Sequence, residues 1–403
     1  MIPFPAWSRG RFQAHFIYTG VAESVFLVFP DGTSALIDCG DHPAITRLHL
    51  AVPVKPSPGR LAGDWVARYV ARVNPFGDNI DYLVVSHFHS DHTGTPGWRS
   101  SAPFGNYPGS PGATRPGADY YRSGFGLAAE HLHFRRAIDR GWPDYDEPSP
   151  LVDGPDRELE HMLKLYAWLQ ERDGLVVEKF RVGARDQIVP LHDPEACRDF
   201  SVFNLCANGR IAMADGTIRD LFGDQPPPAP FNENLMSLGT IFSYGSFRLF
   251  TAGDFSGTVP DGAGGLLQAE DALAEAVPAV DVAKINHNGY HAMPPALVRA
   301  LAPRAWVACV WDQLHLLHDT FARLTDRALY PGDRLVLPGY LPDAIRALPP
   351  EARRDVPDAA FSPVHIVLDV APGGRDYTLT ALSADDEEMR PVATFPFRSQ
   401  LPN

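Results

Sequence analysis

Cysteine is scarce in this sequence of 403 residues, and long apolar runs are missing. The four cysteines, Cys39, Cys197, Cys206 and Cys309, form no CxxC pair. Their spacing argues against a cysteine metal cluster, and a chain of this length needs no disulfide framework, so we expect reduced thiols in or near the core. No stretch of about 18 uninterrupted apolar residues occurs, so no membrane span is expected. The N-terminus has no apolar run of signal-peptide length, and a cytoplasmic location is the default expectation.

Basic residues are also in the minority. The sequence has 35 lysines and arginines against 49 aspartates and glutamates, which gives a formal net charge of −14. This balance argues against a protein that grips long nucleic acid through a broad basic surface. It leaves room for a site in which metal cations supply the positive charge. With 45% hydrophobic and 21% charged residues, the chain has the composition of a globular protein rather than a disordered one.

Apolar periodicity and turn-forming pairs predict a succession of strands and helices. Residues 14–19 and 24–29 are rich in β-forming residues, and Asp31-Gly32 marks the turn to a third strand at 33–38. Further strands are predicted at 80–85, 200–207, 237–244, 247–253, 280–286, 305–311, 334–339, 364–370 and 377–382. Helices are predicted at 61–72, 155–172, 266–277, 295–301 and 319–329, and a proline-rich linker at 225–230. Strands grouped at both ends, with helices between, predict a layered α/β sandwich.

Residues 95–175 differ in character from the rest of the chain. Their first part is rich in glycine, proline and aromatic residues, so we expect an irregular insertion with some helix around 127–139. Three of its aromatic residues are Tyr120, Tyr121 and Phe125. We expect these rings in a local core. The alternative is that they line a substrate pocket, because loops on rigid scaffolds carry specificity.

A histidine cluster directly follows the strand at 80–85. Its residues are His87, His89, Asp91 and His92 in the run Ser-His-Phe-His-Ser-Asp-His-Thr-Gly. Residues two apart on an extended backbone point the same way, so His87 and His89 can reach one metal together. A turn then brings Asp91 and His92 to a neighbouring position, which suits two cations a few ångströms apart. Imidazole and carboxylate ligands favour zinc, with manganese or iron as possibilities.

This HxHxDH loop resembles the signature of the metallo-β-lactamase superfamily. The resemblance extends over most of the chain, from the hairpin near residue 14 to the strands that end near 382. It implies an α/β fold, namely a four-layer αββα sandwich, formed by residues 1–403 as a single domain. Within that domain, the insertion at 95–175 is expected to shape the substrate pocket.

Three further motifs follow in the order that the superfamily shows. Leu36-Ile37-Asp38-Cys39-Gly40 is similar to an early strand end, and this implies that Asp38 supports the metal ligands or binds metal itself. Thr251-Ala252-Gly253-Asp254 resembles a later strand end, whose aspartate bridges the two metals. The segment 284–289 resembles a K-x-x-H-H-G element, which implies His287 as the last ligand of the second metal and Lys284 as a supporting residue.

The sequence departs from the superfamily pattern at two places. No histidine lies between His192 and His287, although many members place a third ligand of the first metal before the bridging aspartate. Asn234 occupies that region and is the candidate for a weak ligand or for a supporting group. Asn288 stands where the second histidine of the K-x-x-H-H-G element is expected. Tyr290 and His291 follow it and are candidates for substrate binding.

A narrower resemblance is to the hydrolase domain of competence proteins of the ComEC/Rec2 type. It rests on Asn-Glu-Asn-Leu-Met-Ser at 232–237, followed by two strands that end in the Thr-Ala-Gly-Asp motif. The turn at 182–188 is also similar. Leu317-His318-Asp319 resembles an H-P element beside the active site, which makes His318 a candidate to contact the substrate. Unlike those proteins, this chain has no expected membrane span.

The resemblance implies a metal-dependent hydrolase with two divalent cations and a metal-bound hydroxide as nucleophile. Asp91 would bind the second metal and orient the nucleophile or take its proton. His318 would hydrogen-bond an oxygen of the substrate. The competence-type features favour a phosphodiester, and the net charge of −14 favours a small or short single-stranded substrate over duplex nucleic acid. No membrane partner is expected.

Three alternatives remain open at this point. The same ligands would serve an ester, lactone or thioester hydrolase. The fold also carries mono-iron dioxygenase chemistry and flavodiiron redox chemistry, although His89 argues against the flavodiiron pattern, which has glutamate there. A non-catalytic interaction protein with a degenerate site is the last alternative. The intact set of His87, His89, Asp91 and His92 argues against it.

Overall fold

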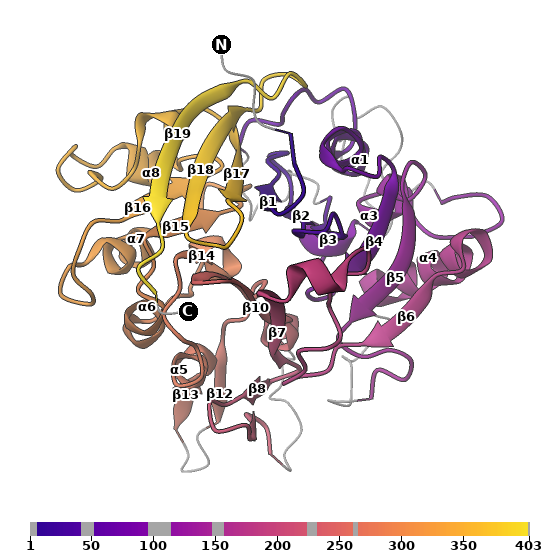
Figure 1. Cartoon of the computed structure of the whole chain (residues 1–403), viewed down its shortest axis with the longest axis horizontal. Helices are drawn as coiled ribbons and strands as arrows, with labels where there is room; N and C mark the ends of the chain where they lie inside the picture. Colours follow the sequence, from indigo (N-terminus) through magenta and orange to yellow (C-terminus); the bar gives the residue numbers. More distant parts are fainter. Residues whose placement is uncertain are drawn as a thin grey trace.

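The computed structural model describes residues 6–41, 52–95, 114–146, 157–223, 232–260 and 265–401. These residues form two large sheets that pack against each other, with helices on the outer side of each sheet (Figure 1). One sheet is covered by α1 (Ala62–Val73), α3 (Phe125–Ala128) and α4 (Arg157–Asp173). The other is covered by α5 (Ala269–Ala274), α6 (Pro295–Leu301), α7 (His318–Thr325) and α8 (Asp343–Arg346). The architecture is the predicted four-layer αββα sandwich.

The first sheet combines an antiparallel half with a parallel half. Within the described residues its nine strands lie in the order β19 (Pro391–Arg398), β18 (Asp376–Ser383), β17 (Val364–Val370), β1 (Phe12–Phe16), β2 (Ser24–Val28), β3 (Ser34–Cys39), β4 (Asn79–Val84), β5 (His133–Asp139), β6 (Val176–Lys179). Pairing is antiparallel from β19 to β3 and parallel from β3 to β6. The first and last parts of the chain therefore meet where β1 pairs with β17.

The second sheet is built from the second half of the chain. Its described strands lie in the order β16 (Leu335–Pro338), β15 (Ala305–Ala308), β14 (Val282–Lys284), β11 (Phe247–Thr251), β10 (Gly239–Tyr244), β7 (Phe200–Ala207), β8 (Arg210–Ala212), β9 (Ile218–Asp220). A separate pair joins β12 (Thr258–Pro260) to β13 (Leu266–Gln268). Strands β11, β14, β15 and β16 are parallel, so their carboxyl ends meet at one edge.

Alternate side chains of β2 pack into two different hydrophobic clusters, one on each face of the sheet. Val25 and Leu27 belong to the large cluster between the sheets. Phe26 and Val28 belong to the cluster beneath α1 and α4. Successive side chains of a strand point to opposite faces, so a strand buried on both faces is apolar throughout. This explains why the hairpin could be predicted from its composition.

The helix predicted around 127–139 is wrong in most of its length. Residues His133–Asp139 form β5, which pairs with β4 and β6 in the first sheet. The segment contains arginine and alanine, which favour helices, but its pairing with two neighbouring strands decides its conformation. The region 95–175 is therefore not irregular throughout. The linker predicted at 225–230 lies outside the described residues.

Other predictions are confirmed with shifted bounds. Helix α5 ends at Ala274 and α7 ends at Thr325, each earlier than predicted. The aromatic rings of Tyr120 and Phe125 are fully buried in the cluster beneath α4, which is the expected local core and not a pocket wall. All four cysteines are free and buried. Among the described helices, none has the length and apolar character that a membrane crossing requires.

Gly40 lies where the sheet approaches the histidine loop most closely. A Cβ atom at this position would lie 1.8 Å from the backbone oxygen of Asp91. We expect Gly40→Ala to lower the free energy of unfolding by about 1–3 kcal/mol, because a backbone atom has to move. Denaturant unfolding measures this change, with Gly59→Ala as the control, because its added Cβ would meet only the Ser57 hydroxyl at 3.2 Å. Equal stability of the two variants would contradict the close approach.

Candidate metal centre

Three strand ends supply the ligand-type residues. Strand β4 runs into the loop with His87 and His89, and the single turn α2 (Ser90–Thr93) carries Asp91 and His92. Asp254 follows β11 of the other sheet. His287 follows β14 in the short turn Asn286–Gly289. The two sheets therefore bring their ligand residues together at one edge of the sandwich.

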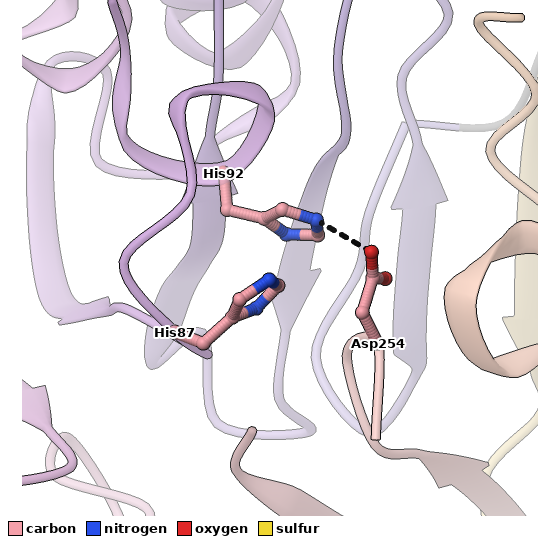
Figure 2. A group of neighbouring side chains, drawn as sticks. All are labelled: His87, His92 and Asp254. Carbon is pink, nitrogen blue, oxygen red and sulfur yellow. Dashed lines mark ion pairs between the residues drawn. The ribbon is translucent and has the colours of Figure 1, made fainter. Parts of the chain in front are cut away.

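The predicted ligands converge at this edge. The Nε2 atom of His92 lies 3.2 Å from a carboxylate oxygen of Asp254 and 3.2 Å from one of Asp91. His287 Nε2 lies 3.7 Å from the same Asp254 oxygen. Figure 2 shows His87 and His92 pointing toward Asp254 across the space between the two sheets. One ligand atom each from His87, His92 and Asp254 lies within 4.8 Å of the others.

Unpaired polar atoms indicate that this cluster fits a cation. Within the described residues, His92 Nε2, Asp254 Oδ1 and Asn234 Oδ1 are buried and have no hydrogen-bond partner. A buried polar atom without a partner costs about 1–3 kcal/mol. In addition, His87 Nε2 and His89 Nδ1 face each other at 3.0 Å. A divalent cation held by these nitrogen and oxygen atoms would satisfy them, and the donor set suits zinc.

Asp38 orients the histidine loop from behind. Its carboxylate accepts hydrogen bonds from the Ser86 amide (2.8 Å) and the Ser86 hydroxyl (2.6 Å). His92 Nδ1 lies 2.8 Å from the same carboxylate. A carboxylate only accepts, so Nδ1 of His92 carries a proton and Nε2 faces the cluster. The geometry gives Asp38 a supporting position rather than a direct ligand position.

The cluster shifts the pKa values of its own members. Burial lowers the pKa of His87 well below its usual value, and His92 and His89 add to this. Burial also disfavours the charged form of His92, but Asp254, Asp91 and Asp38 outweigh it and raise the pKa of His92. His92 in turn holds the pKa of Asp91 and of Asp254 below the usual range, against the effect of burial. A cation bound here would therefore replace a proton on His92.

A buried ion pair holds the turn that carries His287. Lys284 Nζ lies 2.9 Å from Glu23 Oε1, and both side chains are buried. Asn288 Nδ2 donates to Glu23 Oε2 (3.0 Å), and Asn288 Oδ1 accepts from the Cys309 amide (2.8 Å). Both polar atoms of the Asn288 side chain are thus used inside the protein. Asn288, which stands where a histidine was expected, therefore holds the turn in place.

A second buried ion pair, between Arg140 and Glu233, was not predicted from the sequence. The Arg140 guanidinium donates to both Glu233 oxygens, at 2.6 and 2.8 Å. Glu233 Oε1 also accepts from the amide of Phe88, between the two histidines of the HxH segment (3.0 Å). Glu233 precedes Asn234, whose Nδ2 lies 3.4 Å from His287 Nε2. No motif marks Arg140, because its position depends on the unpredicted strand β5.

A pocket of about 460 Å³ opens onto the cluster. On the side of the candidate metal ligands it is lined by His89, Ser90, Asp91, Asn234, Asp254 and His287. Its other side is lined by Tyr290, Trp311, Asp312, Leu314 and His315. The second set comes mostly from the loop between β15 and α7, near which the sequence had singled out His318 but none of these loop residues.

Two residues predicted from the sequence do not reach this pocket. His318 is the first residue of α7 and is exposed, and His291 is exposed beside Tyr290. Neither lines the pocket. The helix begins at His318, so the preceding loop turns His315 toward the site instead. Tyr290 lines the pocket, and its ring centre lies 5.4 Å from that of His287.

The position of Asp38 predicts a loss of metal affinity when its charge is removed. We expect Asp38→Asn to weaken zinc binding about 10- to 100-fold, because an amide holds the tautomer of His92 less firmly. Competition with a chromogenic chelator measures the affinity. Asp81→Asn is a matched control, because Asp81 is also buried and accepts from a backbone amide (Ser34, 3.0 Å) and contacts a histidine (His192, 2.9 Å). Equal zinc affinities in the two variants would refute the role of Asp38.

The comparison with protein families agrees with this geometry. Residues 18–165 match the family described as the metallo-beta-lactamase superfamily, and no curated protein matches the chain. The matched segment includes Asp38 and the complete histidine loop, whereas Asp254 and His287 lie beyond it. Most members of that superfamily are metallohydrolases. The segment 18–165 is therefore similar to a metallo-beta-lactamase superfamily domain.

Proposed function

We propose that the protein is a metal-dependent hydrolase. The observation that carries the proposal is the convergence of histidine and aspartate side chains from both sheets at one pocket. The residues concerned are His87, His89, Asp91, His92, Asp254 and His287. A pocket of about 460 Å³ is in the range of small-molecule sites.

The arrangement suits two cation positions. His87 and His89 would hold one cation, with Asn234 Oδ1 as a weak third ligand. The other position would be held by Asp91, His92 and His287, and Asp254 lies between the two. Divalent cations, with zinc favoured by these donors, would supply Lewis-acid activation of water and of the substrate. Asp91 is ionised at neutral pH because His92 lowers its pKa, so its carboxylate can accept a hydrogen bond from the attacking water.

The first candidate substrate is a small phosphodiester. The resemblance to competence-type hydrolase domains supports this class. The acidic net charge of −14 and the size of the pocket favour a small nucleotide or a short single strand over duplex nucleic acid. Tyr290 and Trp311 in the pocket wall present aromatic rings of the kind that stack with bases.

The second candidate is an ester, lactone or thioester. None of the described residues that line the pocket is lysine or arginine, so cations alone would balance the charge of a phosphate. Leu314, Tyr290 and Trp311 give the pocket an apolar side that suits a neutral carbonyl substrate. The two candidates share every ligand, so the substrate has to be distinguished by turnover.

Turnover of activated esters tests the proposal. We expect the purified protein, supplied with zinc or manganese, to hydrolyse bis(p-nitrophenyl) phosphate. Asp91→Asn should lower kcat at least about 100-fold, because it removes the acceptor that orients water. Asp81→Asn, remote from the pocket, is the control. Turnover of p-nitrophenyl acetate or a lactone alone would replace the phosphodiester by the second candidate, and no hydrolysis by metal-loaded protein would contradict the proposal.

Asn234 allows a test of the first cation position. Asn234→His would add an imidazole where the sequence has none. We expect it to tighten binding of the more weakly held zinc ion at least about tenfold, because about 10–16 kcal/mol of zinc affinity is typically shared among four ligands. Asn234→Ala should have the opposite effect. Zinc stoichiometry and affinity by chelator competition measure both, and an unchanged affinity in both variants would place Asn234 outside the cation site.

A further inference from the structure

The loop between β15 and α7 is fixed to the turn that carries His287. The amides of Leu316 and Leu317 donate to the backbone oxygens of Asn288 (2.8 Å) and Gly289 (3.2 Å). Within the loop, the amide of His315 donates to the backbone oxygen of Asp312 (3.2 Å). The loop is therefore a tight turn anchored to the metal-site segment. It holds His315 in the pocket wall.

The orientation and tautomer of His315 are set by Trp311. The Trp311 amide donates to Nδ1 of His315 at 3.3 Å. A backbone N–H can only donate, so Nδ1 must present its lone pair, and the neutral ring then carries its proton on Nε2. The indole of Trp311 packs edge-on against the imidazole, with ring centres 4.8 Å apart and planes at 83°. The ring is thus held in one orientation.

The Nε2 atom of His315 is available to a molecule in the pocket. His315 is buried to 6% exposure, and within the described residues nothing forms a hydrogen bond with its Nε2. Burial lowers the pKa of His315 to about 4, and His287 adds to this effect. The ring is therefore neutral near pH 7 and keeps one N–H on Nε2. A donor with no hydrogen-bond partner among the described residues, at the wall of the pocket beside the candidate metal ligands, is suited to a substrate oxygen.

We propose that His315 is a catalytic residue whose Nε2–H donates a hydrogen bond to the substrate oxygen on which negative charge develops. The oxygen belongs to the phosphoryl or carbonyl group under attack, and no proton is transferred. A donor that is already oriented stabilises that charge without reorganising during the reaction. The proposal rests on the proposed hydrolase function. It assigns to His315 the role that the sequence had suggested for His318.

Two substitutions of His315 distinguish the effect of the Nε2–H donor from the effect of the rest of the side chain. His315→Gln keeps an N–H near the position of Nε2. His315→Asn keeps an acceptor for the Trp311 amide but does not reach the substrate. On the zinc-loaded protein with bis(p-nitrophenyl) phosphate or p-nitrophenyl acetate, we expect His315→Asn to lower kcat about 100-fold with little change in KM. His315→Gln should recover part of the loss, and zinc content should be unchanged in both.

The kinetic outcomes distinguish a catalytic role of His315 from a structural one. Equal kcat values in wild type and His315→Asn would overturn the proposal. A loss of zinc and of thermal stability that parallels the loss of kcat in both variants would also overturn it, because the effect would then be structural. His318→Asn is measured beside them. A loss at His318 without one at His315 would overturn the assignment in favour of the exposed histidine.

A second measurement does not depend on turnover. In ¹⁵N-labelled, zinc-loaded protein, long-range ¹H–¹⁵N spectra report which nitrogen of His315 carries the proton. We expect a proton on Nε2, and we expect its signal to shift when inorganic phosphate is added. A proton on Nδ1, or no response to phosphate, would overturn the proposal. Phosphate-dependent shifts in a protein that hydrolyses no ester would support the donor role of His315 and count against the proposed function alone.

Discussion

The site depends on the carboxylate of Asp38. Asp38 is the second-to-last residue of β3, has a left-handed backbone (φ 58°) and accepts hydrogen bonds from Ser86 and His92. These bonds join the ends of the neighbouring strands β3 and β4. They also fix the proton of His92 on Nδ1, which leaves Nε2 to face Asp254. One buried carboxylate thus determines the tautomer and orientation of a candidate ligand and the position of the loop that carries other candidates.

Two buried ion pairs hold the remaining parts of the site in place. Lys284 and Glu23 join β14 to the loop before β2, and Arg140 and Glu233 join the end of β5 to the HxH segment. Taking such charges out of water costs free energy that their attraction only partly offsets. The two pairs are therefore weak evidence of added stability, and what the structure shows is which segments they hold together. Each pair connects a strand or strand end of one sheet to a segment that precedes a strand of the other: Lys284 of β14 to Glu23 before β2, and Arg140 after β5 to Glu233 before β10.

The sequence predicted the layered fold, and it singled out most of the candidate ligand residues that the structure brings together, because both leave local signals. Strands buried on two faces are apolar throughout, and the four ligands of the histidine loop lie within six positions. Strand β5 was missed, because its helix-forming residues are extended only through pairing with β4 and β6. Arg140 and His315 were missed for a related reason: their roles come from contacts distant in sequence. His318 was preferred from a motif, although the helix that begins there leaves it exposed.

The turn that carries His287 stores backbone strain. His287 and Asn288 both have positive φ angles, 48° and 45°, and each such residue costs about 1–3 kcal/mol. The hydrogen bonds of Asn288 with Glu23, Cys309 and Leu316 hold this geometry. When these hydrogen bonds break, relief of the backbone strain favours the open form of the turn over its return to the folded geometry. We therefore expect amide hydrogens at 286–289 to exchange with solvent through a local opening on the His287 side, which leaves the sheets and the histidine loop intact.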